Sequence, residues 1–238
     1  MKLDILVFGA HPDDVELGCG GTIIKEIQNG KRVGVIDLTR GELGTRGSVK
    51  IRDTESKKAS QIMGISLRDN MNFSDGFFEN TKKNKILLVE KIRNYQPDIV
   101  ITNALSDRHP DHSRGAQIVI DACFLSGLSK IVTSQDVWRP QAIYHYIQFN
   151  NMQPDFVVDI SQQFSKKIKA VKSYSSQFYN PKSDEPKTII SSEDFLNSIT
   201  YRAQDLGRQT NCKFAEGFIS HQLSVINSFS DLNKKKTE

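Results

Sequence analysis

The chain has 238 residues, of which 37% are hydrophobic and 25% are charged, a composition typical of a globular protein. The net charge is only +4 and the basic residues form no stripe interleaved with aromatic residues, so we predict no nucleic-acid partner. Apolar stretches fall short of the roughly 18 residues that a membrane helix needs, and we predict no membrane partner. Asp4 interrupts the opening apolar segment where a signal peptide would begin its core. With three widely spaced cysteines and no CxxC pair, we expect a cytoplasmic protein.

Patterns typical of strands and helices alternate along the chain. The apolar run at 5–8 predicts a buried strand, and 18–28 predicts a helix that ends before Gly30. The further predicted strands are 33–38, 67–73, 98–102, 141–147 and 156–160. The further predicted helices are 52–63, 86–92, 113–125, 164–174 and 192–206. Residues 175–191 are expected to form a loop near the site or a lid, and 214–226 to close the fold.

This order predicts an α/β fold with a Rossmann-like, doubly wound, mainly parallel sheet. The length suits one domain, which we place at 1–230. Residues 231–238, which include three consecutive lysines, are predicted to be a solvated basic tail.

A cluster of polar residues, HPDD at 11–14, follows the first predicted strand. In open α/β sheets the working groups gather at the carboxyl ends of strands. If helical geometry begins at Pro12, His11 and Asp14 can converge on one point while Asp13 projects in another direction. One acid can therefore bind a metal while its neighbour handles protons.

A second cluster, RHPDH at 108–112, follows the strand predicted at 98–102, and we expect it at the same edge of the sheet. A catalytic zinc site needs about three nitrogen or oxygen ligands and one open position, and His11, Asp14 and His112 provide such a set. Asp13 and His109 then remain free for proton transfer and charge stabilisation. Ferrous iron uses the same ligand types and is the alternative metal.

Three other interpretations stay open. The acids could be structural, with Asp13 and Asp14 facing a helix dipole and Asp111 capping the next helix. The first strand and Asp37 resemble part of a dinucleotide-binding module, but the glycine fingerprint is incomplete and two acids would oppose the pyrophosphate. A metal-dependent phosphoesterase could use similar clusters, although no further acidic pair is clearly assigned to the pocket.

Several motifs taken together resemble one family. HPDD followed by ELGCGGT, then LTRGELGTRGS, then Arg52 and Glu55, and finally RHPDH are similar to the LmbE-like or PIG-L family of zinc-dependent N-deacetylases. Within it, the chain most resembles the bacillithiol-biosynthesis deacetylases, which remove acetyl from N-acetylglucosaminyl malate. The similarity runs from residue 3 to about residue 220.

The resemblance implies a metal-dependent amidohydrolase that cleaves the acetamide of an N-acetylglucosaminide, with other N-acetyl sugars as alternative substrates. The ligands it implies for zinc are His11, Asp14 and His112. It implies Asp13 as general base and His109 as the group that stabilises the oxyanion, and it leaves open which of the two protonates the leaving amine. Arg52 and Arg139 match positions that hold the substrate, and an arginine fork suits a carboxylate such as that of malate. Related enzymes form homo-oligomers, often hexamers, and the same is expected here.

Overall fold

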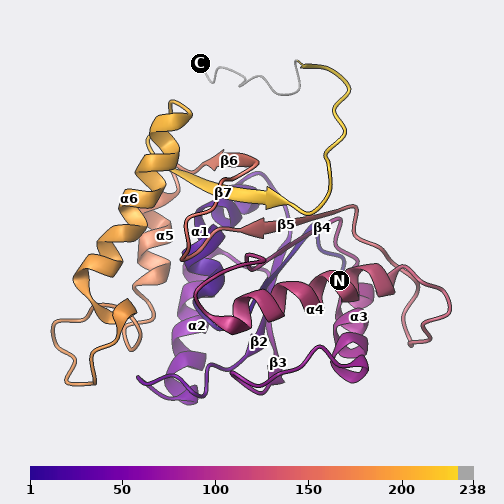
Figure 1. Ribbon diagram of the computed structural model, residues 1–238, viewed down its shortest axis with the longest axis horizontal. Helices are drawn as coiled ribbons and strands as arrows, with labels where there is room; N and C mark the ends of the chain where they lie inside the picture. Colours follow the sequence, from indigo (N-terminus) through magenta and orange to yellow (C-terminus); the bar gives the residue numbers. More distant parts are fainter. Residues whose placement is uncertain (230–238) are drawn as a thin grey trace.

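The computed structural model describes residues 1–229, in which one seven-stranded sheet lies between two layers of helices (Figure 1). The strands follow the order β3-β2-β1-β4-β5-β7-β6 across the sheet. Their bounds are β1 (Ile5–Gly9), β2 (Val33–Thr39), β3 (Leu67–Phe73), β4 (Ile99–Thr102), β5 (Ala142–Tyr146), β6 (Phe156–Asp159) and β7 (Ala215–Ser220). The predicted α/β class with a mainly parallel sheet is confirmed. The predicted tail at 231–238 lies outside the described residues.

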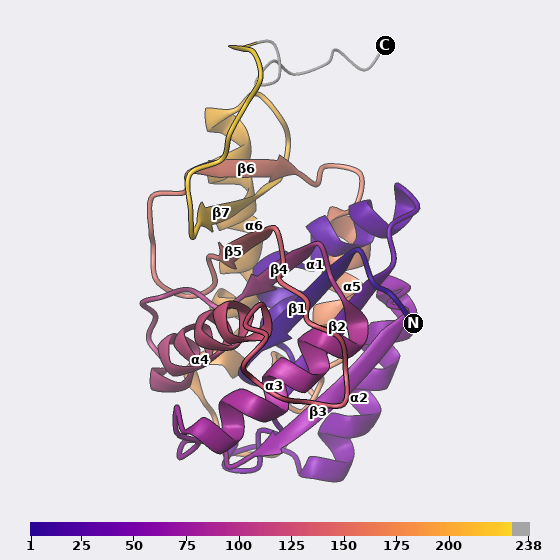
Figure 2. The same cartoon turned by 90° about the vertical axis from the view of Figure 1, so that its right-hand side faces the viewer.

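The first five strands of this order run parallel, whereas β7 pairs antiparallel with both β5 and β6. The sheet is therefore mixed at the edge formed by β7 and β6, which Figure 2 shows far from β3. The predicted closing segment 214–226 is a strand only as far as Ser220. The direction of β7 depends on the path of the connection that precedes it. A local sequence pattern does not encode that path.

Helices cover both faces of the sheet. Their bounds are α1 (Asp14–Gln28), α2 (Val49–Met63), α3 (Lys82–Tyr95), α4 (Pro110–Ser126), α5 (Phe164–Val171), η1 (Ile189–Ser191) and α6 (Glu193–Gln209). One hydrophobic core contains buried side chains of α1, α2, α5 and α6, and a second contains those of α3 and α4. Figure 2 shows α3 and α4 side by side on their face of the sheet. No helix within 1–229 combines the length and hydropathy needed to span a bilayer.

Helices α1 to α4 each begin earlier than the sequence patterns predicted, and the differences in α1 and α4 concern the site. Helix α1 starts at Asp14 rather than at residue 18, with a break in helical geometry at Cys19. Helix α4 starts at Pro110 rather than at residue 113 because proline suits the first helical position and His109 provides the cap. Asp14 and His112 therefore lie in the first turns of helices and are held by helical backbone.

Helix α1 packs very closely against the end of β5. A Cβ atom on Gly18 would fall 2.1 Å from the ring of Tyr146, so this position requires glycine for the observed packing. The nearby Gly20 has no such neighbour, since its closest side-chain atom is 3.6 Å away. The close approach places the beginning of α1 directly beside the end of β5.

Candidate functional site

A cavity of about 460 Å³ opens where β1 and β4 end. These two strands are adjacent, and their connections go to opposite halves of the sheet, which is where open α/β sheets bind ligands. The predicted site residues that line the cavity are His11, Asp13, Asp14, Arg52, His109 and His112. The two polar clusters, almost a hundred residues apart in sequence, thus face one space.

Asp14 stands between the two predicted histidine ligands. Its Oδ2 lies 3.6 Å from Nδ1 of His11, and its Oδ1 lies 3.2 Å from Nε2 of His112. Ligand atoms bonded at about 2.1 Å to a tetrahedral ion are separated by about 3.4 Å, so each of these two distances is of the size found between ligands of one cation, and they involve different oxygens of Asp14. The sets in which one donor atom from each residue lies within 4.8 Å of all the others are His11 with His109 and His112, and His11 with Asp75 and Asp111. The described site therefore holds a group of histidines and acids that could bind a metal ion.

Both histidines have a carboxylate on the ring nitrogen that faces away from Asp14. Nε2 of His11 is 2.9 Å from Asp75 Oδ1, and Nδ1 of His112 is 2.8 Å from Asp107 Oδ2. Asp111 Oδ2 also lies 3.3 Å from Nε2 of His11. Carboxylates in this position orient histidine ligands of metals and increase their basicity.

These three acids were not among the site residues predicted from the sequence. Asp107 and Asp111 flank the RHPDH histidines, so their nearness in sequence was an available signal. Asp75 belongs to the loop after β3, and nothing in its own segment indicates that it meets His11. Asp111 does not cap α4 with its side chain; its backbone N–H instead donates to Nδ1 of His109 over 3.2 Å.

The acids hold the histidines in the protonated state when no cation is bound. Burial disfavours the charged ring, but hydrogen bonds with Asp111, Asp14 and Asp75 raise the pKa of His11 well above its usual value. For His112, burial is likewise outweighed by the charge of Asp14 and the hydrogen bond with Asp107, which raise the pKa to about 9. A bound cation would have to displace these protons.

Asp13 has an unusual backbone and an unusual carboxyl group. It precedes α1 with φ at 119°, a conformation that is costly for a residue with a side chain and is often found at functional sites. Burial raises the pKa of Asp13 to about 7, against the opposing charge of Arg52 and with the added effect of Asp14. Its carboxyl group can therefore exchange a proton near neutral pH.

His109 is an uncharged donor at the side of the cavity. Burial and the positive charges of His11 and His112 lower the pKa of His109, so its ring is neutral at pH 7. Because Nδ1 accepts a hydrogen bond from Asp111, we assign the ring proton to Nε2. A neutral ring in this tautomer can donate one hydrogen bond to a ligand.

The guanidinium of Arg52 is paired with the carboxyl group of Asp13. Its Nη2 donates to Asp13 Oδ2 at 3.2 Å and to Gln177 Oε1 at 2.5 Å. Gln177 belongs to the predicted loop at 175–191, and its Nε2 donates to the carbonyl of Arg46. The loop lies beside the cavity, as the sequence analysis expected.

Arg139 requires a correction, because it does not line this cavity. Its Nη2 donates to the carbonyl of Phe124, and its guanidinium lies 4.8 Å above the Phe124 ring, beside a different cavity. Residue 139 comes just before β5, so it lies at the amino end of a parallel strand, on the opposite edge of the sheet from His11. The family resemblance matched Arg139 by its position in the sequence. That position does not show at which edge of the sheet the residue lies.

A polar cavity at the topological switch point, with a possible metal group and an acid that titrates near pH 7, is typical of an enzyme active site and suits hydrolysis. The model of the PIG-L family, described as GlcNAc-PI de-N-acetylase, matches residues 6–123. The chain belongs to this family of metal-dependent deacetylases and is an enzyme that hydrolyses N-acetyl amides.

Three similar proteins illustrate the relationship. A diacetylchitobiose deacetylase from Thermococcus kodakarensis is 29% identical over 229 residues, covering 90% of this chain and 81% of that protein. A Bacillus anthracis protein named "Probable N-acetyl-alpha-D-glucosaminyl L-malate deacetylase 2" is 27% identical, covering 73% of this chain and 81% of its own. The crystal structure of a conserved protein from Thermus thermophilus has a TM-score of 0.86 and 32% identity, covering 95% of this chain and 99% of that one.

Proposed function

We propose that this enzyme removes the acetyl group from N-acetylglucosaminides and that N-acetylglucosaminyl malate, the bacillithiol precursor, is its substrate. The observation that carries the hydrolytic part is the spacing of Asp14 from His11 and His112, with Asp13 beside them. The names of the Thermococcus and Bacillus relatives support an N-acetylated sugar, and the Bacillus name supports the malate conjugate.

We assign the metal to His11, Asp14 and His112, and we propose zinc, with ferrous iron as the alternative. We prefer this set to one containing His109, because Nδ1 of His109 accepts the hydrogen bond that caps α4 and its Nε2 then carries the ring proton. Once bound, the ion would supply a Lewis acid for the amide carbonyl and promote ionisation of water near neutral pH.

The chain's own groups carry the proton transfers. Asp13, whose pKa lies at about 7, takes the proton of the attacking water as the general base. The Nε2–H of His109 donates to the oxygen that becomes negative in the tetrahedral intermediate. A neutral His109 has no excess proton, so we assign protonation of the leaving amine to Asp13, which has just received one. Arg52 holds the Asp13 carboxyl in place throughout.

The cellular setting is part of the same proposal. We propose a cytoplasmic enzyme whose catalytic domain spans 1–230. We further propose that it acts as a homo-oligomer, with a hexamer as the expected form.

The test measures free amine released from a panel of N-acetylglucosaminides by zinc-loaded protein. We expect Asp13→Asn to reduce turnover by about 10²- to 10⁴-fold, the usual contribution of a general base, while the metal content stays unchanged. His11→Ala should lose the metal. Absence of amine release by the wild-type protein, or phosphate release from sugar phosphates instead, would refute the proposed function.

A further inference from the structure

Most positive charges around the cavity are already matched. Arg52 pairs with Asp13 at 3.2 Å, and Lys167 pairs with Glu216 at 2.6 Å. Arg46 donates to the carbonyls of the 175–191 loop and lies 3.8 Å from a glutamate of that loop. These three cations hold the walls of the cavity together, so little of their charge remains for a ligand.

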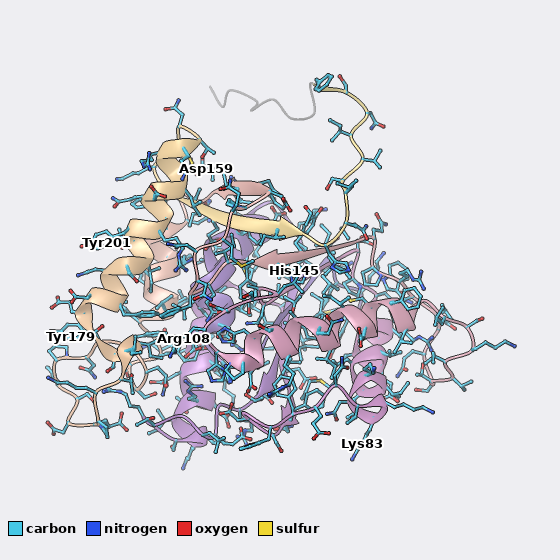
Figure 3. The ribbon with its side chains drawn as sticks, in the orientation of Figure 1. Lys83, Arg108, His145, Asp159, Tyr179 and Tyr201 are labelled. Carbon is cyan, nitrogen blue, oxygen red and sulfur yellow. The ribbon has the colours of Figure 1, made fainter. Side chains whose placement is uncertain are left out.

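Two arginines in the wall differ from these. Arg108 and Arg202 line the cavity, and neither has a carboxylate within 4.0 Å among residues 1–229. Arg108 comes from the loop before α4, and Arg202 comes from α6. Figure 3 shows Arg108 between the beginning of α4 and helix α6, whereas Tyr201 points away on the outer side of α6. Segments far apart in sequence thus bring two unmatched guanidinium groups to one part of the cavity.

Both guanidinium groups contact the same residue. Arg108 lies 4.7 Å above the ring of Phe149, and Nη2 of Arg202 donates to the carbonyl of Phe149 over 2.6 Å. Each arginine keeps further N–H donors beyond this one contact, because a guanidinium carries five. Phe149 thus contacts both positively charged groups, one through its ring and the other through its carbonyl.

Asp107 links the backbone around Arg108 and Phe149 to the proposed metal site. Asp107 Oδ1 accepts from the backbone N–H of Arg108 and of Asn150, each at 2.8 Å. The other oxygen of Asp107 contacts Nδ1 of His112. Asp107 is thus fully engaged and is not a partner for the guanidinium groups. A ligand held by the arginines would therefore keep a defined position relative to the reacting amide.

The energetics favour an anionic ligand at this place. Burial lowers the pKa of Arg202, and the charge of Asp107 opposes this change only in part. Arg202 is half-buried and Arg108 is exposed, so the cost of removing a cation from water without a paired anion falls on Arg202, and an incoming carboxylate would offset that cost. Two forked guanidinium groups also match the planar shape of a carboxylate.

We propose that Arg108 and Arg202 form a subsite that binds a carboxylate on the aglycone of the substrate. The inference rests on the proposed deacetylase function and deepens it, because it assigns residues to the acidic part of the malate conjugate. It also distinguishes this enzyme from one that acts on a neutral disaccharide, for which two unmatched arginines would have no counterpart.

The experiment compares three substrates with metal-loaded, full-length protein: N-acetylglucosaminyl malate, its dimethyl ester, and N,N'-diacetylchitobiose. We expect the wild-type kcat/KM to be at least tenfold higher for the malate conjugate than for the ester, since a hydrogen bond to a charged group contributes about that much. Arg108→Met and Arg202→Met should each lower this ratio by about tenfold, mainly through KM. Arg208→Met is the matched control, because Arg208 lies on α6 outside the cavity lining and pairs with Asp205; it should leave the ratio unchanged.

The outcomes separate the two proposals. Equal rates on the diacid and the ester by the wild-type enzyme would overturn the subsite and leave the deacetylase function intact. No amine release from any of the three substrates would refute the function itself. If a methionine variant fails to fold, inhibition of the wild type by free malate but not by dimethyl malate gives the same decision, and equal inhibition by both would overturn the subsite.

Discussion

The protonation of the metal site gives the sharpest test of its chemistry. In the metal-free protein the pKa of His112 is about 9, and the pKa of His11 is also raised well above 6.5. Both rings are therefore protonated at pH 7, and a cation that takes their nitrogen atoms must release both protons. We predict that zinc binding at pH 7 releases about two protons.

The magnitude follows from the distance between pH and pKa. At pH 7 the medium is about two units below the pKa of His112, and each unit corresponds to 1.36 kcal/mol. Displacing this proton alone costs about 2.7 kcal/mol at pH 7, which by itself weakens zinc binding about 100-fold relative to a ring that is already deprotonated. Since affinity changes tenfold per pH unit for each proton released, two protons predict about a 100-fold gain from pH 6 to pH 7.

Titration calorimetry in two buffers with different ionisation enthalpies counts the protons directly. Asp107→Asn should lower the pKa of His112 and so reduce the release measured at pH 8, because the hydrogen bond from Asp107 helps to keep that ring charged. Asp13→Asn controls for Asp13, which also titrates close to pH 7. Release of less than one proton at pH 7, with an affinity independent of pH, would refute the assignment of both histidines as ligands.

Two further predictions concern the packing around the cavity. Lys167→Met should lower the free energy of unfolding by about 3 kcal/mol, because it leaves Glu216 buried without its cation. In urea denaturation, the double variant with Glu216→Gln should recover part of this loss. Gly18→Ala should cost about 1–3 kcal/mol through overlap with the Tyr146 ring, whereas Gly20→Ala should not destabilise the fold; equal denaturation midpoints for both alanine variants would contradict the packing argument.

Local sequence patterns determined much of the fold. The buried strand β1 is a continuous apolar run and β2 is mostly apolar, and their bounds agree with the prediction to within one residue. The two polar clusters were recognisable because each directly follows a strand, and parallel strands place such segments at one edge. His11, Asp14 and His112 could therefore be brought together by argument before their positions were known.

The arrangement of partners was decided only by the tertiary structure. Asp75 meets His11 across 64 residues, and Glu216 accepts hydrogen bonds from the backbone of α1 across 195. Neither contact is signalled by periodicity, which reports whether a residue is buried but not what it is buried against. Arg139 is a further example, because its matching position in the sequence did not reveal that it lies at the amino end of β5.

The sequence by itself thus determined the strands, the helices and the chemical groups at the strand ends, because these depend on neighbours within a few residues. The tertiary structure alone decided the direction of β7, the acids behind each histidine and the pairing of charges in the cavity wall. Those features depend on energies between distant groups, which exist only once the chain has folded.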